Sequence, residues 1–171
     1  VAALLEMTRI IKSGAPYRNT ILLAFTDAEE TGLLGAEAFF AESPAAGRVK
    51  AVINLEGSGS SGPAYLLRTG PASGGLMAAF RDVAPHPFAQ SFTEEIFKRM
   101  PNDTDFSVSL RAGLPGIDFA FAGERNHYHT PLDSIANLDL GTLQHHGENT
   151  LPLLRALAGA DLSATGPNEV Y

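Results

Sequence analysis

Acidic residues and histidines stand directly after three apolar segments of the sequence, where they have the right chemistry to act together. Asp27, Glu29 and Glu30 follow the segment 20–25, Glu56 follows 49–55, and His127 and His129 come after 117–121. Carboxylates gathered in one crevice repel one another unless a positive charge lies among them. Because carboxylates and imidazoles are ligands of divalent metals, these residues predict a metal site.

The adjacent glutamates Glu29 and Glu30 can take two different roles, because the side chains of neighbouring residues diverge. One carboxylate can bind the cation while the other holds a water molecule and takes its proton, which is the chemistry of metal-assisted amide hydrolysis. An alternative interpretation is that both acids simply begin the next helix, where the helix dipole favours them. Between His127 and His129, the residues alone do not decide which one is a ligand.

Other acidic and histidine residues lack an apolar strand immediately before them. Glu94 and Glu95 are predicted to lie on a solvated face. His145 and His146 are neighbours on the closing helix, where they cannot share one face, and both are predicted to lie at the surface. His86 stands between two prolines and is predicted to lie in a loop.

The elements that must position the acidic cluster alternate between helices and strands. Apolar spacing and turn residues predict helices at 1–11, 33–42, 73–83 and 142–158, and strands at 20–25, 49–55, 65–68 and 117–121. This order predicts an α/β fold, a three-layer sandwich with a central, mostly parallel or mixed sheet and helices on both faces. Ligands of such sheets bind outside the carboxyl ends of the strands, where the acidic residues lie.

Composition sets the broad class of the protein. With 171 residues, 44% of them hydrophobic, the chain can bury the core of one domain, predicted at 1–160 with a tail or linker at 161–171. The net charge of -7 disfavours nucleic acid as a partner. The absence of cysteine excludes a thiolate nucleophile and a cysteine zinc site. No apolar stretch reaches membrane-spanning length, so no membrane contact is predicted for this segment.

Several motifs resemble those of the M28 family of zinc aminopeptidases. The most specific is the acidic nonamer at 27–35, Asp-Ala-Glu-Glu-Thr-Gly-Leu-Leu-Gly. The motifs at 54–57, 102–106, 115–121 and 128–130 are similar to the branch of endoplasmic reticulum metallopeptidases and vacuolar membrane proteases. The resemblance covers residues 1–160, and it implies the zinc-exopeptidase fold and a peptide substrate.

The resemblance also implies a role for each matching residue. Glu29 is expected to be the general base, and Tyr128 to donate a hydrogen bond to the developing oxyanion. Glu30 is expected to be a ligand of one zinc ion, Glu56 a ligand of the other, and His129 the last ligand. Residues expected beside the site or in its pocket are Asp27, Asp105, His127 and Arg125. The complete family site holds two zinc ions.

The sequence departs from the family pattern at its start. The family also needs an upstream histidine and a bridging aspartate, which would precede the helix that begins at Val1. The chain is therefore expected to be an N-terminally truncated catalytic domain without its first strands. We expect the segment to be inactive alone, not to hold zinc tightly, and to leave a sheet edge open to self-association.

Three functions are compatible with these residues. The first is an aminopeptidase that hydrolyses N-terminal peptide bonds. The second is a related carboxypeptidase or glutaminyl-cyclase-like enzyme, in which Arg125 would bind a carboxylate. The third is a non-catalytic peptide-binding module, which the missing ligands favour and the retained Glu29 disfavours. The resemblance implies a location on the extracytoplasmic or lumenal side of a membrane, with any anchor outside this chain.

Overall fold

The fold is seen in a computed structural model that describes residues 1–163 and 166–167. The α-helices are α1 (Ala2–Lys12), α2 (Leu34–Glu42), α3 (Gly74–Val83), α4 (Ser91–Phe97), α5 (Phe106–Arg111) and α6 (Leu140–Gly159). The strands are β1 (Val52–Gly57), β2 (Tyr65–Thr69) and β3 (Gly116–Phe121). Short 3-10 helices are η1 (Ala46–Arg48), η2 (Arg125–His127) and η3 (Ile135–Asn137).

The strands form a mixed sheet in the order β1-β3-β2. β1 pairs with β3 in parallel, and β2 pairs with β3 in the antiparallel direction. The outer edge of β2 is partly covered, because Leu66 N donates to Phe88 O at 2.8 Å. Because β1 and β3 are parallel, their carboxyl ends lie at the same edge of the sheet, as the predicted site requires.

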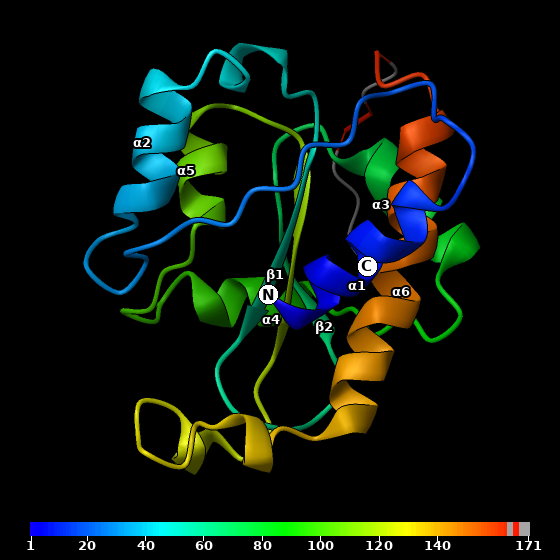
Figure 1. Ribbon diagram of the computed structural model, residues 1–171. Helices are drawn as coiled ribbons and strands as arrows, with labels where there is room; N and C mark the ends of the chain where they lie inside the picture. The colour runs from blue at the N-terminus through cyan, green and yellow to red at the C-terminus, as the bar shows by residue number, and fades with distance from the viewer. Residues whose placement is uncertain (164–165, 168–171) are drawn as a thin grey trace.

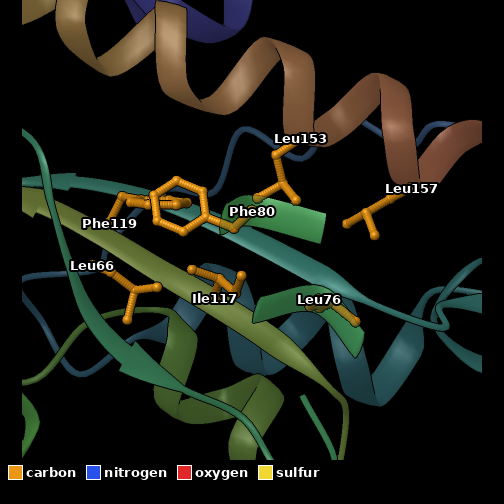
Figure 2. Close-up of a cluster of buried hydrophobic side chains, with 7 residues drawn as sticks. All are labelled: Leu66, Leu76, Phe80, Ile117, Phe119, Leu153 and Leu157. Carbon is orange, nitrogen blue, oxygen red and sulfur yellow. The ribbon is translucent and has the colours of Figure 1, made fainter. Parts of the chain in front are cut away.

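Helices cover both faces of the sheet, which confirms the predicted α/β sandwich. Figure 1 views the sheet nearly edge-on, with α2 and α5 on one side and α1, α3 and α6 on the other. The main apolar core lies under α3 and α6, and Figure 2 shows its side chains pointing toward one another from the two helices and the sheet. Its buried members are Leu66, Leu76, Phe80, Ile117, Phe119, Leu153 and Leu157.

The predicted strand at 20–25 was wrong. Residues 20–28 run without helix or strand, and Leu22 and Phe25 are each 51% exposed. An apolar run becomes a strand only where the backbone of another strand pairs with it. In the described part of the chain β1 pairs with β3 alone, and this segment joins no strand.

Two predictions about surface residues were also wrong. Glu94 lies against β2, where its carboxylate accepts hydrogen bonds from the backbone N and the hydroxyl of Thr69, both at 3.2 Å. His146 is only 4% exposed, because its side of α6 faces the rings of Phe119 and Phe121. Of the predicted tail, residues 164–165 and 168–171 lie outside the described residues, while Gly166 bridges to Ser73.

The remaining predicted elements are present with small changes at their ends. β1 extends to Gly57, so Glu56 is the last but one residue of the strand. α6 is continuous through Pro152. Within the described residues, no helix combines the length and the hydrophobicity needed to cross a bilayer.

Candidate active site

A cleft opens beyond the carboxyl ends of β1 and β3 and runs along α4. Its polar lining consists of Glu29, Glu30, Glu56, Ser58, Thr93, Asn102, Asp103, Thr104, Arg125 and Tyr128. Its remaining walls are Gly57, Tyr65, Leu67, Ile96, Phe97, Met100 and Ala120. The predicted residues from three separate segments thus meet in one cleft.

The loop that carries the two glutamates is a tight turn ahead of α2. Ala28 and Leu33 both have positive φ, at 58° and 61°, and Asp27 Oδ1 accepts from Ala28 N at 2.8 Å. Gly35 N donates to Asp27 O at 3.0 Å, and a Cβ at Gly35 would collide with the Asp27 backbone. Asp27 therefore shapes the turn that presents the glutamates, rather than lining the cleft.

Glu29 and Glu30 have different surroundings although they are adjacent. Burial raises the pKa of the Glu29 carboxyl, and the negative charges of Glu30, Asp105 and Asp103 raise it further. The Glu30 side chain is 62% exposed, and its Oε1 lies 2.6 Å from His129 Nε2. The surroundings therefore distinguish the two carboxylates: that of Glu29 is partly enclosed, and that of Glu30 contacts an imidazole.

The loop after β3 brings Tyr128 into the lining of the cleft, whereas His129 lies outside the lining and contacts Glu30. The two rings stack with centroids 3.8 Å apart, and His129 has a positive φ of 57°. His127 points elsewhere, because its Nδ1 lies 2.6 Å from the hydroxyl of the buried Ser60. The pKa of the Tyr128 phenol is raised by burial and by the neighbouring carboxylates. The loop therefore offers an imidazole and a protonated phenol side by side.

Glu56 lies deeper in the cleft than the other glutamates. Burial, followed by the charge of Asp118, raises the pKa of its carboxyl to about 7. The amide of Asn54 donates to Glu56 Oε1 at 3.1 Å. Glu56 is thus the cleft carboxylate whose charge is least well compensated.

Asp105 lies behind the cleft rather than in its lining. Its Oδ2 accepts a hydrogen bond from Thr26, and its Oδ1 is buried without a hydrogen-bond partner. Arg125 lines the cleft but is exposed. The auxiliary roles of Asp105 and Arg125 stay predictions.

The donor atoms in the cleft suit zinc in type. Imidazole nitrogen and carboxylate oxygen are both ordinary zinc ligands. Glu30 and His129, two of the three expected ligands, are already in contact. No three histidine, aspartate or glutamate side chains among the described residues converge closely enough to hold an ion. The ligand set Glu30, Glu56 and His129 stays a prediction.

Sequence reasoning missed three residues that this geometry brings forward. Asn54 and Arg68 belong to a buried hydrogen-bond network that reaches Glu56, and Ser60 binds His127. Asn54 stands two residues before Glu56, so the strand period of two was a usable signal. Arg68 and Asp118 were each a charged residue within an apolar strand, which calls for a partner on a neighbouring strand.

Comparison with known proteins identifies the family. The family model of peptidase family M28 matches residues 1–154. The chain belongs to peptidase family M28.

Relatives within the M28 family agree with the predicted branch. Endoplasmic reticulum metallopeptidase 1 of Rattus norvegicus is 34% identical over 168 residues, which cover 96% of this chain and 19% of the relative. The vacuolar membrane protease of Clavispora lusitaniae is 38% identical over 147 residues, which cover 85% of this chain and 14% of the relative. The chain thus spans less than a fifth of the length of either relative.

The fold is similar to that of a solved structure. A zinc aminopeptidase from Bacillus subtilis, BSAP, matches with a TM-score of 0.66 and 22% identity, over 95% of this chain and 41% of that chain. This likeness confirms the predicted fold class.

Proposed function

We propose that the protein is a zinc metallopeptidase that removes N-terminal residues from peptides, with Glu29 as general base. The observation that supports it best is the cleft in which Glu29, Glu30 and Glu56 are gathered with Tyr128 at the carboxyl ends of parallel strands. Membership of peptidase family M28 supports the substrate class. Peptide hydrolysis fits the cleft because it needs a base and an oxyanion donor close together.

Glu30, Glu56 and His129 would hold zinc, and the contact between Glu30 and His129 is the part of this set that the fold already forms. When bound, zinc polarises the scissile carbonyl and makes a water molecule more acidic. Two ions in the complete protein belong to the proposal. The ligands beyond these three would come from outside the residues described.

Glu29 takes the proton of the attacking water and passes it to the leaving amine. Its raised pKa suits this task, because a base works best when its pKa lies near the working pH. Tyr128 keeps its proton, since its pKa is raised, and donates a hydrogen bond to the developing oxyanion.

The wall formed by α4 adds an apolar surface beside these groups. Ile96 and Phe97 of α4, together with Met100 just after the helix, belong to the cleft lining. Such a wall would receive an apolar side chain of the substrate, while the surrounding carboxylates attract its free amine. Arg125 is the basic residue in this lining, where it would serve a carboxypeptidase by binding a substrate carboxylate.

The names of the relatives support a membrane-associated location. They are an endoplasmic reticulum metallopeptidase and a vacuolar membrane protease. We infer that the protein acts at such a membrane, on its lumenal or extracytoplasmic side. Self-association through the outer edge of β1 is a further part of the proposal, because no strand among the described residues pairs with that edge and an unpaired edge can accept another strand.

The substitution Glu29→Gln tests the mechanism. It keeps the size of the side chain and removes the base, so kcat on leucine p-nitroanilide is expected to fall at least about a hundredfold. Zinc affinity should change little, because Glu29 is not among the proposed ligands. The measurement is steady-state kinetics of the complete gene product, together with zinc competition against a chromophoric chelator.

The matched control is Glu95→Gln, which changes a glutamate on the exposed side of α4 that pairs with Lys98. It should leave kcat unchanged. Activity that survives Glu29→Gln would refute Glu29 as the base, and activity that survives removal of zinc would refute the metallopeptidase. Equal hydrolysis of N-acetyl-leucine p-nitroanilide would rule out an aminopeptidase.

A further inference from the structure

A row of three polar side chains crosses the sheet just below the cleft. Asn54 of β1 stands opposite Asp118 of β3, and Asp118 stands opposite Arg68 of β2. The register of β2 shifts between Leu66 and Arg68, so the ladder is irregular where Arg68 meets Asp118. Each strand therefore contributes one member of the row at the same level.

The buried pair of Arg68 and Asp118 is the rigid part of this row. Asp118 is fully buried, and its Oδ2 accepts from Arg68 Nε at 3.1 Å and from Arg68 Nη2 at 3.0 Å. The guanidinium also donates to the hydroxyls of Ser107 and Thr104, and it lies 4.5 Å from the ring centroid of Phe97. The hydroxyl of Thr104 donates to the same Oδ2 at 3.2 Å, so Arg68 and Thr104 hold that oxygen while Oδ1 faces Asn54.

Asn54 connects this pair to the cleft. Its Nδ2 donates to Asp118 Oδ1 at 2.9 Å and to Glu56 Oε1 at 3.1 Å. An amide has two N–H donors on one nitrogen, and both are used here. The reversed orientation would turn the amide oxygen toward two carboxylates, so Asp118 fixes which way Asn54 points.

We propose that the row Arg68–Asp118–Asn54 positions the Glu56 carboxylate, with Asn54 as the positioning residue that contacts it. Glu56 lies two residues beyond Asn54 and therefore on the same face of β1. The row holds one oxygen, Oε1, and leaves Oε2 directed by that constraint. This inference rests on the proposed function, in which Glu56 binds zinc and the row orients it for that role.

A purely structural role would leave a different signature. If the row served only to bind the strands together, weakening it would lower the free energy of unfolding and leave zinc binding by the folded protein intact. A positioning role instead predicts a loss of zinc affinity and of kcat in protein that remains folded. Partners behind metal ligands typically contribute about tenfold to a hundredfold in affinity or activity.

The test is Asn54→Thr in the complete gene product. Threonine suits a strand and keeps one O–H donor in place of two N–H donors, so it cannot donate to Asp118 and Glu56 at the same time. We expect Zn²⁺ affinity, measured by chelator competition, and kcat on leucine p-nitroanilide each to fall about tenfold or more, with KM changed less than twofold. Asn54→Leu, which removes both donors, should lose as much kcat and also lower the unfolding temperature.

The matched control is Asn19→Leu. The amide of Asn19 also donates twice, to Leu157 O at 2.8 Å and Ala160 O at 2.9 Å, but far from the cleft. It should lower stability and leave zinc affinity and kcat within twofold. Wild-type zinc affinity and kcat in folded Asn54→Thr would overturn the positioning role. If Glu29→Gln stays active, the proposed function itself fails, so the two failures are distinguishable.

Discussion

The side chains of the candidate site differ in how strongly their contacts restrain them. Glu56 is buried and receives a hydrogen bond from Asn54. Glu30 and His129 are both more than half exposed and contact each other across two loops. The position of His129 therefore depends on the loop that carries it. That loop is anchored two residues earlier, where His127 binds the buried hydroxyl of Ser60.

The substitution Ser60→Ala should loosen this anchor. Removing the hydroxyl leaves His127 Nδ1 without its partner 2.6 Å away, so the loop can move and the contact between His129 and Glu30 weakens. We expect zinc affinity to fall about tenfold. The loss of one hydrogen bond should also cost about 1 kcal/mol of unfolding free energy. Chelator competition and urea denaturation measure the two effects.

A second buried serine provides the control for Ser60. Ser109 is 1% exposed, and its hydroxyl donates to Phe106 O at 2.7 Å within α5. Ser109→Ala should lower stability similarly without changing zinc affinity. Equal zinc affinity in Ser60→Ala and the wild-type protein would show that the anchor does not matter to His129.

The sequence alone predicted which residue types meet, but not how they are held. Glu29, Glu30 and Glu56 were found because each stands at the end of an apolar segment, and the choice of His129 over His127 came from the family motif. Ser60 carried no signal by itself, and Asn54 was marked only by standing two residues before Glu56 on the same strand. Their contacts join residues 67 and 64 positions apart, and such pairings depend on loop paths and strand register.

At the scale of elements, α6 links the core to the site. Its inner side packs Leu153 and Leu157 into the main core, and its first turn lies beside Ser60. Asp139 caps the helix, because its Oδ1 accepts from Thr142 N at 2.7 Å, and its own backbone N donates to Ser60 O at 2.8 Å. Asp139 therefore stabilises both the start of α6 and the loop that carries Ser60.

The substitution Asp139→Ala removes this cap. The Thr142 N–H then loses its partner, and the unfolding free energy should fall by about 1 kcal/mol. Urea denaturation measures the change. Asp139→Asn is the control, because asparagine caps helices as well as aspartate does and should retain most of the stability. If alanine and asparagine were equally destabilising, the carboxylate charge rather than the cap would matter.

Helices and strands were predicted well where the local sequence pattern determines them, and poorly where strand pairing or helix packing determines them. The predicted helices and the strands β1, β2 and β3 formed within a few residues of their expected bounds, because spacing, glycine and proline act locally. Residues 20–25 have the composition of a buried strand, yet in the part of the chain that the structure describes they form no strand. His146 was misplaced for a related reason, since only the packing of α6 on Phe119 and Phe121 decides which histidine is buried.

Across the whole molecule, two buried titrating groups act on stability in opposite directions. Burial lowers the pKa of His146 to about 4. Above pH 6.5 His146 is neutral in both the folded and the unfolded state. As the pH falls from 6.5 toward 4, the unfolded state takes up a proton first, so the free energy of unfolding decreases. Glu56 has a pKa raised from 4.5 to about 7, so its neutral form is favoured by folding. Below pH 4.5 the Glu56 carboxyl is protonated in both states and does not lower the free energy of unfolding. As the pH rises from 4.5 toward 7, the unfolded state loses this proton first, and the free energy of unfolding declines.

The substitution Glu56→Gln should therefore stabilise the zinc-free protein in a pH-dependent way. Glutamine keeps the shape and can still accept the hydrogen bond of Asn54, but it cannot become a buried, uncompensated charge. The gain in unfolding free energy over the wild-type protein should be small at pH 4.5 and rise to about 3 kcal/mol at pH 7. Urea denaturation across this range, with a chelator present, measures it.

The histidine provides the comparison of opposite sign. His146→Leu removes the group that takes up a proton on unfolding, so its stability relative to wild type should increase as the pH falls from 6.5 to 4. A Glu56→Gln gain that stayed constant with pH would mean that the carboxyl of Glu56 titrates normally in the folded protein. Zinc would then not be needed to relieve a buried charge, and Glu56 would lose the electrostatic part of the case for its being a ligand.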